Sequence, residues 1–414
     1  MTSVQRKTFI ASFLGWTLDA FDYFLVIVVV PHLAKDFNVD VGAVLVAVTL
    51  TLAMRPIGAL IFGWIADRYG RRLPLMVDIG LYSILELATA FAPNLTVFLI
   101  LRALFGIAMG GEWGLGSALA MESLPAKSRG LYSGILQEGY AVGYLLAGQA
   151  LAWLYPISWI GWRGLFVVGA LPAVLIFFIR AHVPESPVWM AGKHERLSLG
   201  RDVLLATLKR SWPLFLFGAV MMTAFNALSH GTQDIYPTFL KAQLHFDPKI
   251  AGNIISFASL GAILGGICFG ALSQRIGRRW AIALAAVVGA LVVPLWAFDH
   301  TIALVATGGF AMQFAVQGAW GIIPAHLNEI APRLARGTFP GFVYQIGNLL
   351  SSPTAQIIAA LAAGTFAVGG APDYAKAMAV FTICALAAVI FTTLLGRFVV
   401  PENRDVDFSE IPAD

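Results

Sequence analysis

Residues 63–72 read Gly63-Trp64-Ile65-Ala66-Asp67-Arg68-Tyr69-Gly70-Arg71-Arg72, and residues 270–279 repeat the pattern as Gly270-Ala271-Leu272-Ser273-Gln274-Arg275-Ile276-Gly277-Arg278-Arg279. The two copies are separated by 207 residues, from 63 to 270. The same separation relates a second set that includes two tryptophans: Gly111, Trp113, Gly114, Ala118, Glu122, Pro125, Arg129 and Gly130 recur as Gly318, Trp320, Gly321, Ala325, Glu329, Pro332, Arg336 and Gly337. Chance does not produce that many identities at one separation, so the chain consists of two related halves.

The composition is that of a protein that crosses a membrane many times. Of the 414 residues, 58% are hydrophobic and 12% are charged, with a mean hydropathy of +0.78. Soluble domains carry roughly 25% charged residues. Segments of about 20 apolar residues, long enough to cross a bilayer, recur along the chain. We predict twelve, centred near residues 22, 53, 83, 108, 142, 172, 226, 261, 288, 314, 348 and 386.

The predicted fold is an all-α membrane protein whose twelve transmembrane helices form two pseudo-symmetric six-helix bundles. The N-terminal bundle covers residues 1–182 and the C-terminal bundle covers residues 213–398. A polar linker, residues 183–212, joins them, and residues 399–414 form a tail. We read the long first span as retained, because it lacks the small-residue cleavage site of a signal peptide.

The positions of the basic residues predict the orientation. Most of the 27 Lys and Arg fall in the N-terminus, the even-numbered loops and the C-terminus, and the opposite loops hold only Lys35, Arg163, Lys241, Lys249 and Lys376. This bias predicts that both termini lie in the cytoplasm. We expect the chain to reside in the inner (cell) membrane. The bias also explains the net charge of +4 without a nucleic-acid partner.

The seventh predicted span carries a stripe of polar side chains. Asn226, His230, Asp234 and Thr238 recur every four residues, with Ser229 and Gln233 beside them. At helical spacing these side chains share one face. Water is absent at that depth, so titratable groups there indicate a pathway for a solute, and they favour protons being transported with it. The alternative is a set of polar side chains that satisfy one another within the bundle.

The chain resembles the major facilitator superfamily over nearly its whole length. The loop motif Gly-x-x-x-Asp-Arg-x-Gly-Arg-Arg, read here at residues 63–72, is that superfamily's signature. Shorter matches are Arg102 with Gly106 and Gly110 in the fourth span, and Pro184-Glu185-Ser186-Pro187 and Pro401-Glu402 after the sixth and twelfth spans. The resemblance implies a transporter, and parallel repeats of this kind place the substrate site between the halves near the bilayer midplane.

A finer resemblance concerns the seventh span. Its polar positions follow Asn-x-x-Ser-His-x-x-Gln-Asp-x-x-x-Thr, a pattern of Jen-type carboxylate transporters. This resemblance implies that lactate or pyruvate moves together with a proton, through Asn226, His230, Gln233 and Asp234. Two alternatives stay open: a carrier of sialate, an aromatic acid or a dicarboxylate, and a membrane sensor that binds a carboxylate without transporting it.

The repeat points to further proton-coupling candidates. Subtracting 207 maps Asn226 to Asp19 and Ser229 to Asp22 in the first span. We expect at least one of these aspartates to take part in coupling, together with His230 and Asp234. Alternatively they are structural, with one of them pairing with Arg102, which is itself a coupling candidate.

A carboxylate substrate needs a cation or several hydrogen-bond donors. Arg55 lies in the middle of the second span, its repeat position is Ala262, and we predict it to be the anchor, free of a fixed acidic partner. Arg102 is the competing candidate. Further predicted ligands are Gln345 and Asn348 in the eleventh span and Tyr140 in the fifth, since amides and hydroxyls suit an anion with a neighbouring oxygen. The alternative for these is ordinary packing.

Charged residues near the predicted cytoplasmic face suggest a gate between the halves. The resemblance implies a salt-bridge network there, with these members: Asp67, Arg68, Glu122, Arg129, Glu185, Arg275, Glu329, Arg336 and Glu402. Gln274 replaces the acidic residue in the second loop copy, which weakens the expected interaction. The sequence lacks phosphate-binding loops, metal-ligand spacings and nucleophile motifs, so we expect neither an enzyme nor a cofactor or metal. We expect a monomer in the lipid bilayer.

Overall fold

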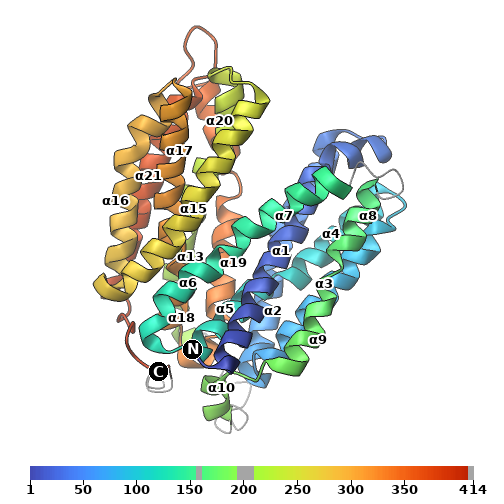
Figure 1. Cartoon of the computed structure of the whole chain (residues 1–414), viewed down its shortest axis with the longest axis vertical. Helices are drawn as coiled ribbons and strands as arrows, with labels where there is room; N and C mark the ends of the chain where they lie inside the picture. Colours follow the sequence, from blue (N-terminus) through green and yellow to red (C-terminus); the bar gives the residue numbers. More distant parts are fainter. Residues whose placement is uncertain (155–160, 194–208, 409–414) are drawn as a thin grey trace.

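The computed structural model describes residues 1–154, 161–193 and 209–408. Its architecture is all-helical, and its helices fall into two bundles (Figure 1). The first bundle contains α1 (Ser3–Asp36), α2 (Val41–Tyr69), α3 (Arg72–Ala90), α4 (Leu95–Met109), α5 (Glu112–Ser123), α6 (Arg129–Gln137), α7 (Gly139–Leu154), α8 (Gly161–Gly169) and α9 (Ala173–His182), with a 3-10 turn η1 (Ala126–Ser128) before α6. The short helix α10 (Pro187–Ala191) follows, and residues 194–208 of the predicted linker lie outside the described residues.

The second bundle begins at α13 (Trp212–Gln233). It continues with α14 (Tyr236–Thr238), the π-helical turn η2 (Phe239–Gln243), α15 (Pro248–Ile276), α16 (Arg278–Phe298), α17 (Ile302–Trp320), α18 (Ile323–Ile330), the 3-10 turn η3 (Arg333–Ala335), α19 (Phe339–Ser351), α20 (Thr354–Ala363), α21 (Tyr374–Leu395) and the 3-10 turn η4 (Gly396–Phe398). The described tail continues to Phe408.

The helices agree with the hydropathy pattern. Within the described residues, eleven helical stretches are long and apolar enough to cross a membrane, and each contains one of the predicted span centres. The remaining predicted span, centred near residue 142, falls on α6 and α7. These two helices are separated at Glu138 and contain 9 and 16 residues, so neither alone reaches the roughly 20 residues that a crossing requires.

The two bundles approach each other on one side of the molecule. Both ends of the described chain lie there, and the ribbons of the two bundles diverge toward the opposite side (Figure 1). We call the side that holds the start of α1 and Phe408 the terminal side. Across the bundles, α6 packs on α15, α2 on α19, and α5 on α18.

Glycines permit this close approach. A Cβ atom on Gly134 of α6 would lie 2.2 Å from the carbonyl oxygen of Gly266 in α15. Similarly, a Cβ on Gly114 of α5 would lie 2.8 Å from the Cα of Gly341 in α19. Since no larger residue fits at these crossings, backbone meets backbone, as small residues allow in membrane helices.

The conformation of the repeated loop requires the glycine that both copies of the motif contain. Gly70 and Gly277 end α2 and α15 with φ angles of 105° and 100°, a conformation that residues with a Cβ rarely adopt. At both positions the chain turns directly into the next helix. The two loops are therefore the same local structure in both halves.

Candidate functional site

The polar part of the seventh span centres on His230. Its Nδ1 lies 3.0 Å from Oδ2 of Asp234, and its Nε2 lies 3.2 Å from Oδ1 of Asn348 on α19. Both partner atoms are oxygens, so both ring nitrogens donate only when the imidazole carries its second proton. The side chains of His230 and Asp234 are 26% and 42% exposed, so both remain partly accessible.

The expectation of one continuous polar face in this span is wrong. Helix α13 ends at Gln233, and Thr238 lies beyond the break, at the end of α14. Gln233 donates instead to Oε1 of Gln313 on α17 at 2.9 Å, and Ser229 lies 3.5 Å from Nε2 of Gln317 on the same helix. These side chains therefore turn into the second bundle, while His230 and Asp234 face α19 and the space between the halves.

Asn226 also has a local partner. Its Nδ2 donates to the carbonyl oxygen of Met222 at 2.8 Å, one turn earlier on α13, and the residue is buried. The break in the helix one turn after His230 is typical of transporters, in which discontinuous helices form binding sites near the midplane.

Arg55 has a fixed acidic partner, so the prediction that it has none is wrong. Its Nη2 donates to Oδ2 of Asp19 on α1 at 2.8 Å, and both side chains are buried. The guanidinium carbon also lies 5.4 Å from the ring centroid of Tyr23. The sequence did not predict Asp19 as the partner, because the contact depends on how α1 and α2 are rotated against each other. Packing sets that rotation, and no local sequence pattern encodes it. The Nε of Arg55 is buried and makes no hydrogen bond within the described residues, so the guanidinium keeps a donor.

Arg102 is paired as well, but with neither predicted aspartate. Its Nη2 contacts Oε2 of Glu86 on α3 and lies 3.1 Å from Oγ1 of Thr89. Both carboxylate oxygens of Asp22 are buried and accept no hydrogen bond from any described residue. The expected pairing of Asp19 or Asp22 with Arg102 is therefore corrected: Asp19 bonds to Arg55, and Glu86 takes Arg102.

Aromatic rings from both bundles meet beside these groups. Trp16 of α1 stacks on Tyr140 of α7 with centroids 5.7 Å apart. Tyr344 of α19 lies 4.5 Å from the ring of Trp113 and 5.7 Å from that of Trp320. The repeat flagged the two tryptophans but not their partner Tyr344, because a lone aromatic residue in an apolar span carries no positional signal.

Tyr140 lies within electrostatic reach of charged groups of both halves. The hydroxyl of Tyr140 interacts electrostatically with Tyr23, Tyr344, Asp234 and Arg55. Thus Arg55 of the first half and Asp234 of the second flank one aromatic and polar region. Among the predicted ligands, the structure brings together Arg55, Tyr140, His230 and Asn348 around it.

Gln345 stands out among the buried amides. The residue is 1% exposed, and neither its Nε2 nor its Oε1 has a hydrogen-bond partner within the described residues. A buried polar group without a partner is destabilising by about 1–3 kcal/mol. Such a group is retained when it serves a purpose other than stability.

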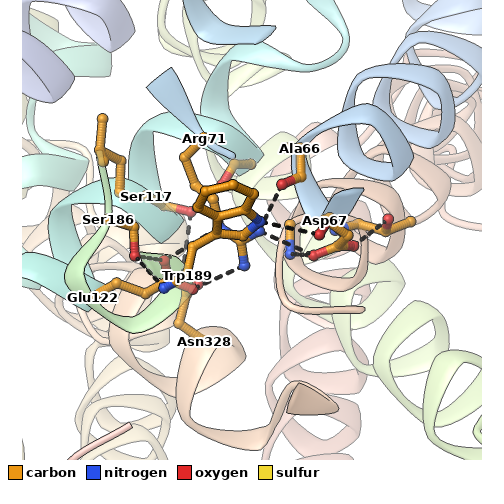
Figure 2. Close-up of polar contacts among 12 residues, drawn as sticks. Ala66, Asp67, Arg71, Ser117, Glu122, Ser186, Trp189 and Asn328 are labelled. Atoms are coloured by element: carbon orange, nitrogen blue, oxygen red, sulfur yellow. Dashed lines mark hydrogen bonds and ion pairs between the residues drawn. The ribbon is translucent and has the colours of Figure 1, made fainter. Parts of the chain in front are cut away.

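The terminal side is closed by Asp67. Its carboxylate accepts hydrogen bonds across the halves from the N–H groups of Gly337 and Thr338, at 2.7 and 3.0 Å, and from the Thr338 hydroxyl at 2.7 Å. In Figure 2, Asp67 lies beside Arg71, whose Nη1 is 3.3 Å from its carboxylate. Trp189 of α10 donates its indole N–H to the Asp67 carbonyl at 3.2 Å.

Two equivalent buried ion pairs lie behind this contact. Arg71 donates to Glu122 at 3.0 and 3.2 Å, and Arg278 donates to Glu329 at 2.7 and 2.9 Å. Ser186 also contacts Glu122 (Figure 2). Each partner of the first pair lies 207 residues before its counterpart. In both halves the pair joins the loop motif to the end of a later span on the terminal side.

The prediction that Arg68 and Arg275 belong to the ion-pair network is wrong, because Arg71 and Arg278 form these pairs. Arg68 lies beside the ring of Tyr69, with 5.7 Å to its centroid, and the side chain of Arg275 is exposed. The second arginine after the aspartate or glutamine, Arg71 or Arg278, points inward instead, because it stands at the start of the next helix and is buried there. The motif contains several arginines, and only packing distinguishes them.

Glu185 and Glu402, which we predicted as members of a salt-bridge network, accept hydrogen bonds from the backbone of the loop in their own half. Glu185 accepts the N–H groups of Arg71 and Arg72 at 2.7 and 3.1 Å, and Glu402 accepts that of Arg278 at 2.6 Å. These carboxylates compensate backbone donors at the start of α3 and α16, where helices leave N–H groups unpaired.

Gln274 takes the place of Asp67 in the second loop and makes a weaker version of its contact. Its Oε1 accepts the N–H of Gly130 across the halves at 3.1 Å, as Asp67 accepts the N–H of Gly337. The amide makes one such bond where the aspartate makes three, which agrees with the expected weakening.

Arg129 and Arg336 meet at the tail. The ring of Phe408 is fully buried between their guanidinium carbons, at 3.6 and 4.3 Å from its centroid. Arg129 also donates to the carbonyl oxygen of Val406 at 2.8 Å. One arginine comes from each half, so the tail joins the halves on the terminal side. The predicted gate did not include this aromatic residue.

Comparison with known proteins supports the two-half architecture. A family model described as Major Facilitator Superfamily matches residues 12–233 and again residues 232–410. The carboxylic acid transporter protein homolog of Saccharomyces cerevisiae is 31% identical over 92% of this chain, which spans 66% of that protein. The sialic acid transporter NanX of Escherichia coli is 28% identical, with 88% and 89% of the two chains covered.

Two solved structures share the fold. The proton:xylose symporter XylE superposes with a TM-score of 0.72 at 20% identity, covering 99% of this chain and 98% of XylE. The human organic anion transporter MFSD10 superposes with a TM-score of 0.74 at 15% identity, covering 94% and 100% of the two chains. At these identities the structures show the fold alone. The chain belongs to the major facilitator superfamily and is a multi-pass membrane transporter, not an enzyme.

Proposed function

We propose that the protein is a proton-coupled symporter of a short monocarboxylate such as lactate or pyruvate, working by alternating access in the inner membrane. The observation that carries the proposal is the placement of His230. It bonds to Asp234 and Asn348 beside the region that holds Arg55. An anion-binding cation and a titratable pair therefore share one polar region between the halves.

The relatives support an organic acid as the substrate class. Besides the yeast and Escherichia coli proteins, they include a probable 4-methylmuconolactone transporter and a cis,cis-muconate transport protein. The compounds in these names differ in size and in the number of rings, but the acids among them share a carboxylate group. Arg55 offers a planar fork of donors suited to that group.

In the proposed cycle, the anion displaces part of the contact between Arg55 and Asp19, which leaves Asp19 without its counter-charge. A proton taken up by Asp19, Asp22 or the His230–Asp234 pair then offsets the added charge. Neutralising the region lowers the free-energy cost of moving the loaded site past the low-dielectric midplane. Gln345 and Asn348 supply donors and acceptors for the substrate oxygen next to the carboxylate.

The gate follows from the orientation that the basic residues predict. With both termini in the cytoplasm, the contacts of Asp67, Gln274 and Phe408 close the cytoplasmic side, and the protein faces outward. One chain contains both halves of the site and of the gate, so a monomer suffices.

A second candidate is a carrier of an aromatic or unsaturated acid. The aromatic lining favours it: Trp16, Tyr23, Tyr140 and Tyr344 surround the charged groups, and flat π-systems stack on such rings. Sialate, with many hydroxyls, matches this lining less well than muconate-type acids do.

The test is uptake of radiolabelled lactate by the purified protein in proteoliposomes, with and without an inwardly directed proton gradient. We expect accumulation only with the gradient, and competition by pyruvate. Stronger competition by muconate or benzoate than by pyruvate would move the assignment to the second candidate. Binding without uptake of any acid would indicate a sensor instead of a carrier.

A further inference from the structure

The geometry points to an anionic phospholipid site on the outer surface of the second bundle, between α16 and α21. A groove of about 800 Å³ runs there along the ends of the two helices nearest the terminal side. Arg279, Arg397 and Glu402 line one end of this groove, and apolar side chains of α16 and α21, among them Trp280, Ile390 and Phe391, form the rest of it.

The charged end is suited to a phosphate group. Arg279 and Arg397 both line the groove and repel each other electrostatically, while Glu402 attracts Arg279. Arg279 donates one bond to the carbonyl oxygen of Val400 at 2.5 Å, while its buried Nε has no hydrogen-bond partner within the described residues. Arg397 is exposed, with its guanidinium carbon 5.2 Å from the ring centroid of Phe398. An anion bound here would relieve the repulsion between the arginines.

The acid in the groove offsets one of its two positive charges. Glu402 is the carboxylate among the lining residues; it attracts Arg279 and also accepts the N–H of Arg278 at 2.6 Å. Two guanidinium groups and one engaged carboxylate leave a net positive charge where α16 begins and α21 ends. That is the level of lipid headgroups for helices that cross the bilayer.

The apolar part is suited to an acyl chain. Ala387, Ile390, Phe391 and Leu394 recur at i, i+3, i+4 and i+7, so they form one stripe along α21. The stripe extends for about 10 Å from Leu394 toward the middle of the helix. Trp280, 63% exposed at the start of α16, stands at the depth where aromatic residues anchor proteins to the membrane interface.

The tryptophan of this groove belongs to the second half alone. Leu73 takes the place of Trp280 in the first bundle, whereas both arginines have counterparts: Arg72 matches Arg279, and Arg180 stands five residues before Glu185 as Arg397 stands five residues before Glu402. A free anion would need only the arginines, whereas the continuous apolar stripe requires a ligand with a hydrocarbon chain. We therefore commit to a phospholipid with an anionic headgroup.

The experiment compares phosphatidylglycerol with phosphatidylcholine of identical acyl chains, added to the full-length protein in detergent. Native mass spectrometry gives the affinity of each lipid, and thermal unfolding gives its stabilising effect. For the wild type we expect tighter binding and a larger rise in unfolding temperature with phosphatidylglycerol. Arg397→Gln should weaken phosphatidylglycerol binding about fivefold and leave phosphatidylcholine unchanged.

Matched variants keep the test decisive. Arg397 is exposed, so its replacement does not threaten folding, unlike that of Arg279 with its bond to Val400. Arg6→Gln removes another exposed arginine on the terminal side, in the other half, and should retain the full preference. Equal binding of both lipids by the wild type, or an undiminished preference in Arg397→Gln, would overturn the proposal. Inorganic phosphate reproducing the whole thermal shift would overturn it as well, in favour of a free-anion site.

Discussion

Asp67 accepts both the backbone N–H and the hydroxyl of Thr338, which lies in the opposite half of the molecule, at 3.0 and 2.7 Å. The bond therefore has to break whenever the two halves separate on the terminal side. Hydrogen bonds to a charged group contribute about 1.5–3 kcal/mol each. A conformational equilibrium that depends on such a contact is sensitive to a single side chain.

Asp67→Asn should shift the protein toward the form that is open on the terminal side. Asparagine keeps one acceptor oxygen but loses the charge, and a loss of about 1.5 kcal/mol changes the ratio of the two forms about tenfold. Spin labels attached to cysteines at positions 69 and 276, where Tyr69 and Ile276 are exposed and lie in opposite halves, would be farther apart than in the wild type. Electron paramagnetic resonance measures this distance. The exposed Cys268 and Cys384 are replaced by serine beforehand. Arg68→Gln, a change in the same motif, should leave the distance unaltered; an equal effect of both changes would contradict this role of Asp67.

Arg55→Lys should weaken lactate binding about 30-fold or more, because lysine keeps the charge but loses the planar fork. Arg55→Ala alone leaves Asp19 buried and unpaired, which destabilises a protein by about 3–5 kcal/mol. The double variant Arg55→Ala with Asp19→Asn should recover the unfolding temperature without recovering binding. Calorimetry measures the affinities, and wild-type affinity in the double variant would exclude Arg55 as the anchor.

Lactate accumulation should increase as the external pH falls, and His230 and Asp234 should carry this dependence. Both ring nitrogens of His230 face oxygen acceptors, so the protonated ring satisfies more contacts than the neutral ring does. Tyr23 and Tyr140 are further titratable groups that interact electrostatically with Asp234, and both also interact with Arg55. Asp234→Asn should abolish gradient-driven accumulation while exchange continues, and His230→Ala should flatten the pH profile. An unchanged profile in both variants would assign coupling to Asp19 or Asp22.

Gln345→Met should raise the unfolding temperature and change the preference among lactate, pyruvate and acetate. Methionine has a similar length and no polar group, so the destabilisation by an unpaired buried amide, about 1–3 kcal/mol, is removed. Gln313→Met is the control, because Gln313 bonds to Gln233 and Thr232 and its replacement should lower the unfolding temperature. If Gln345→Met is destabilised like the control and keeps the wild-type competition profile, Gln345 is a packing residue.

Phe408→Ala should loosen the terminal side. Each cation–π contact contributes about 0.5–2 kcal/mol, and the ring contacts arginines of both halves. The same pair of spin labels should report a larger open fraction than in the wild type. Phe408→Trp preserves an aromatic face and should retain most of the closure. Identical label distances in the wild type and Phe408→Ala would show that the tail does not stabilise the closed form of the terminal side.

Several properties of this protein are determined by its sequence alone, because the forces behind them act locally. Backbone groups inside a bilayer must bond within their own helix, so apolar stretches of sufficient length reveal the spans. The repeat reveals the two halves, since equivalent residues recur at one separation. His230 and Asp234 are neighbours because residues four apart share a helix face, whatever surrounds that helix.

Other properties are decided only by the tertiary structure. Asp19 pairs with Arg55, Glu86 with Arg102, and Glu122 with Arg71 across separations of 16 to 51 residues. Which partner each arginine meets depends on the rotation of every helix about its own axis. That rotation is set by contacts among all the helices of a bundle, so no single segment encodes it. Packing also decides the direction of Gln233. The local sequence pattern predicts that it shares a face with His230, but its side chain points toward α17.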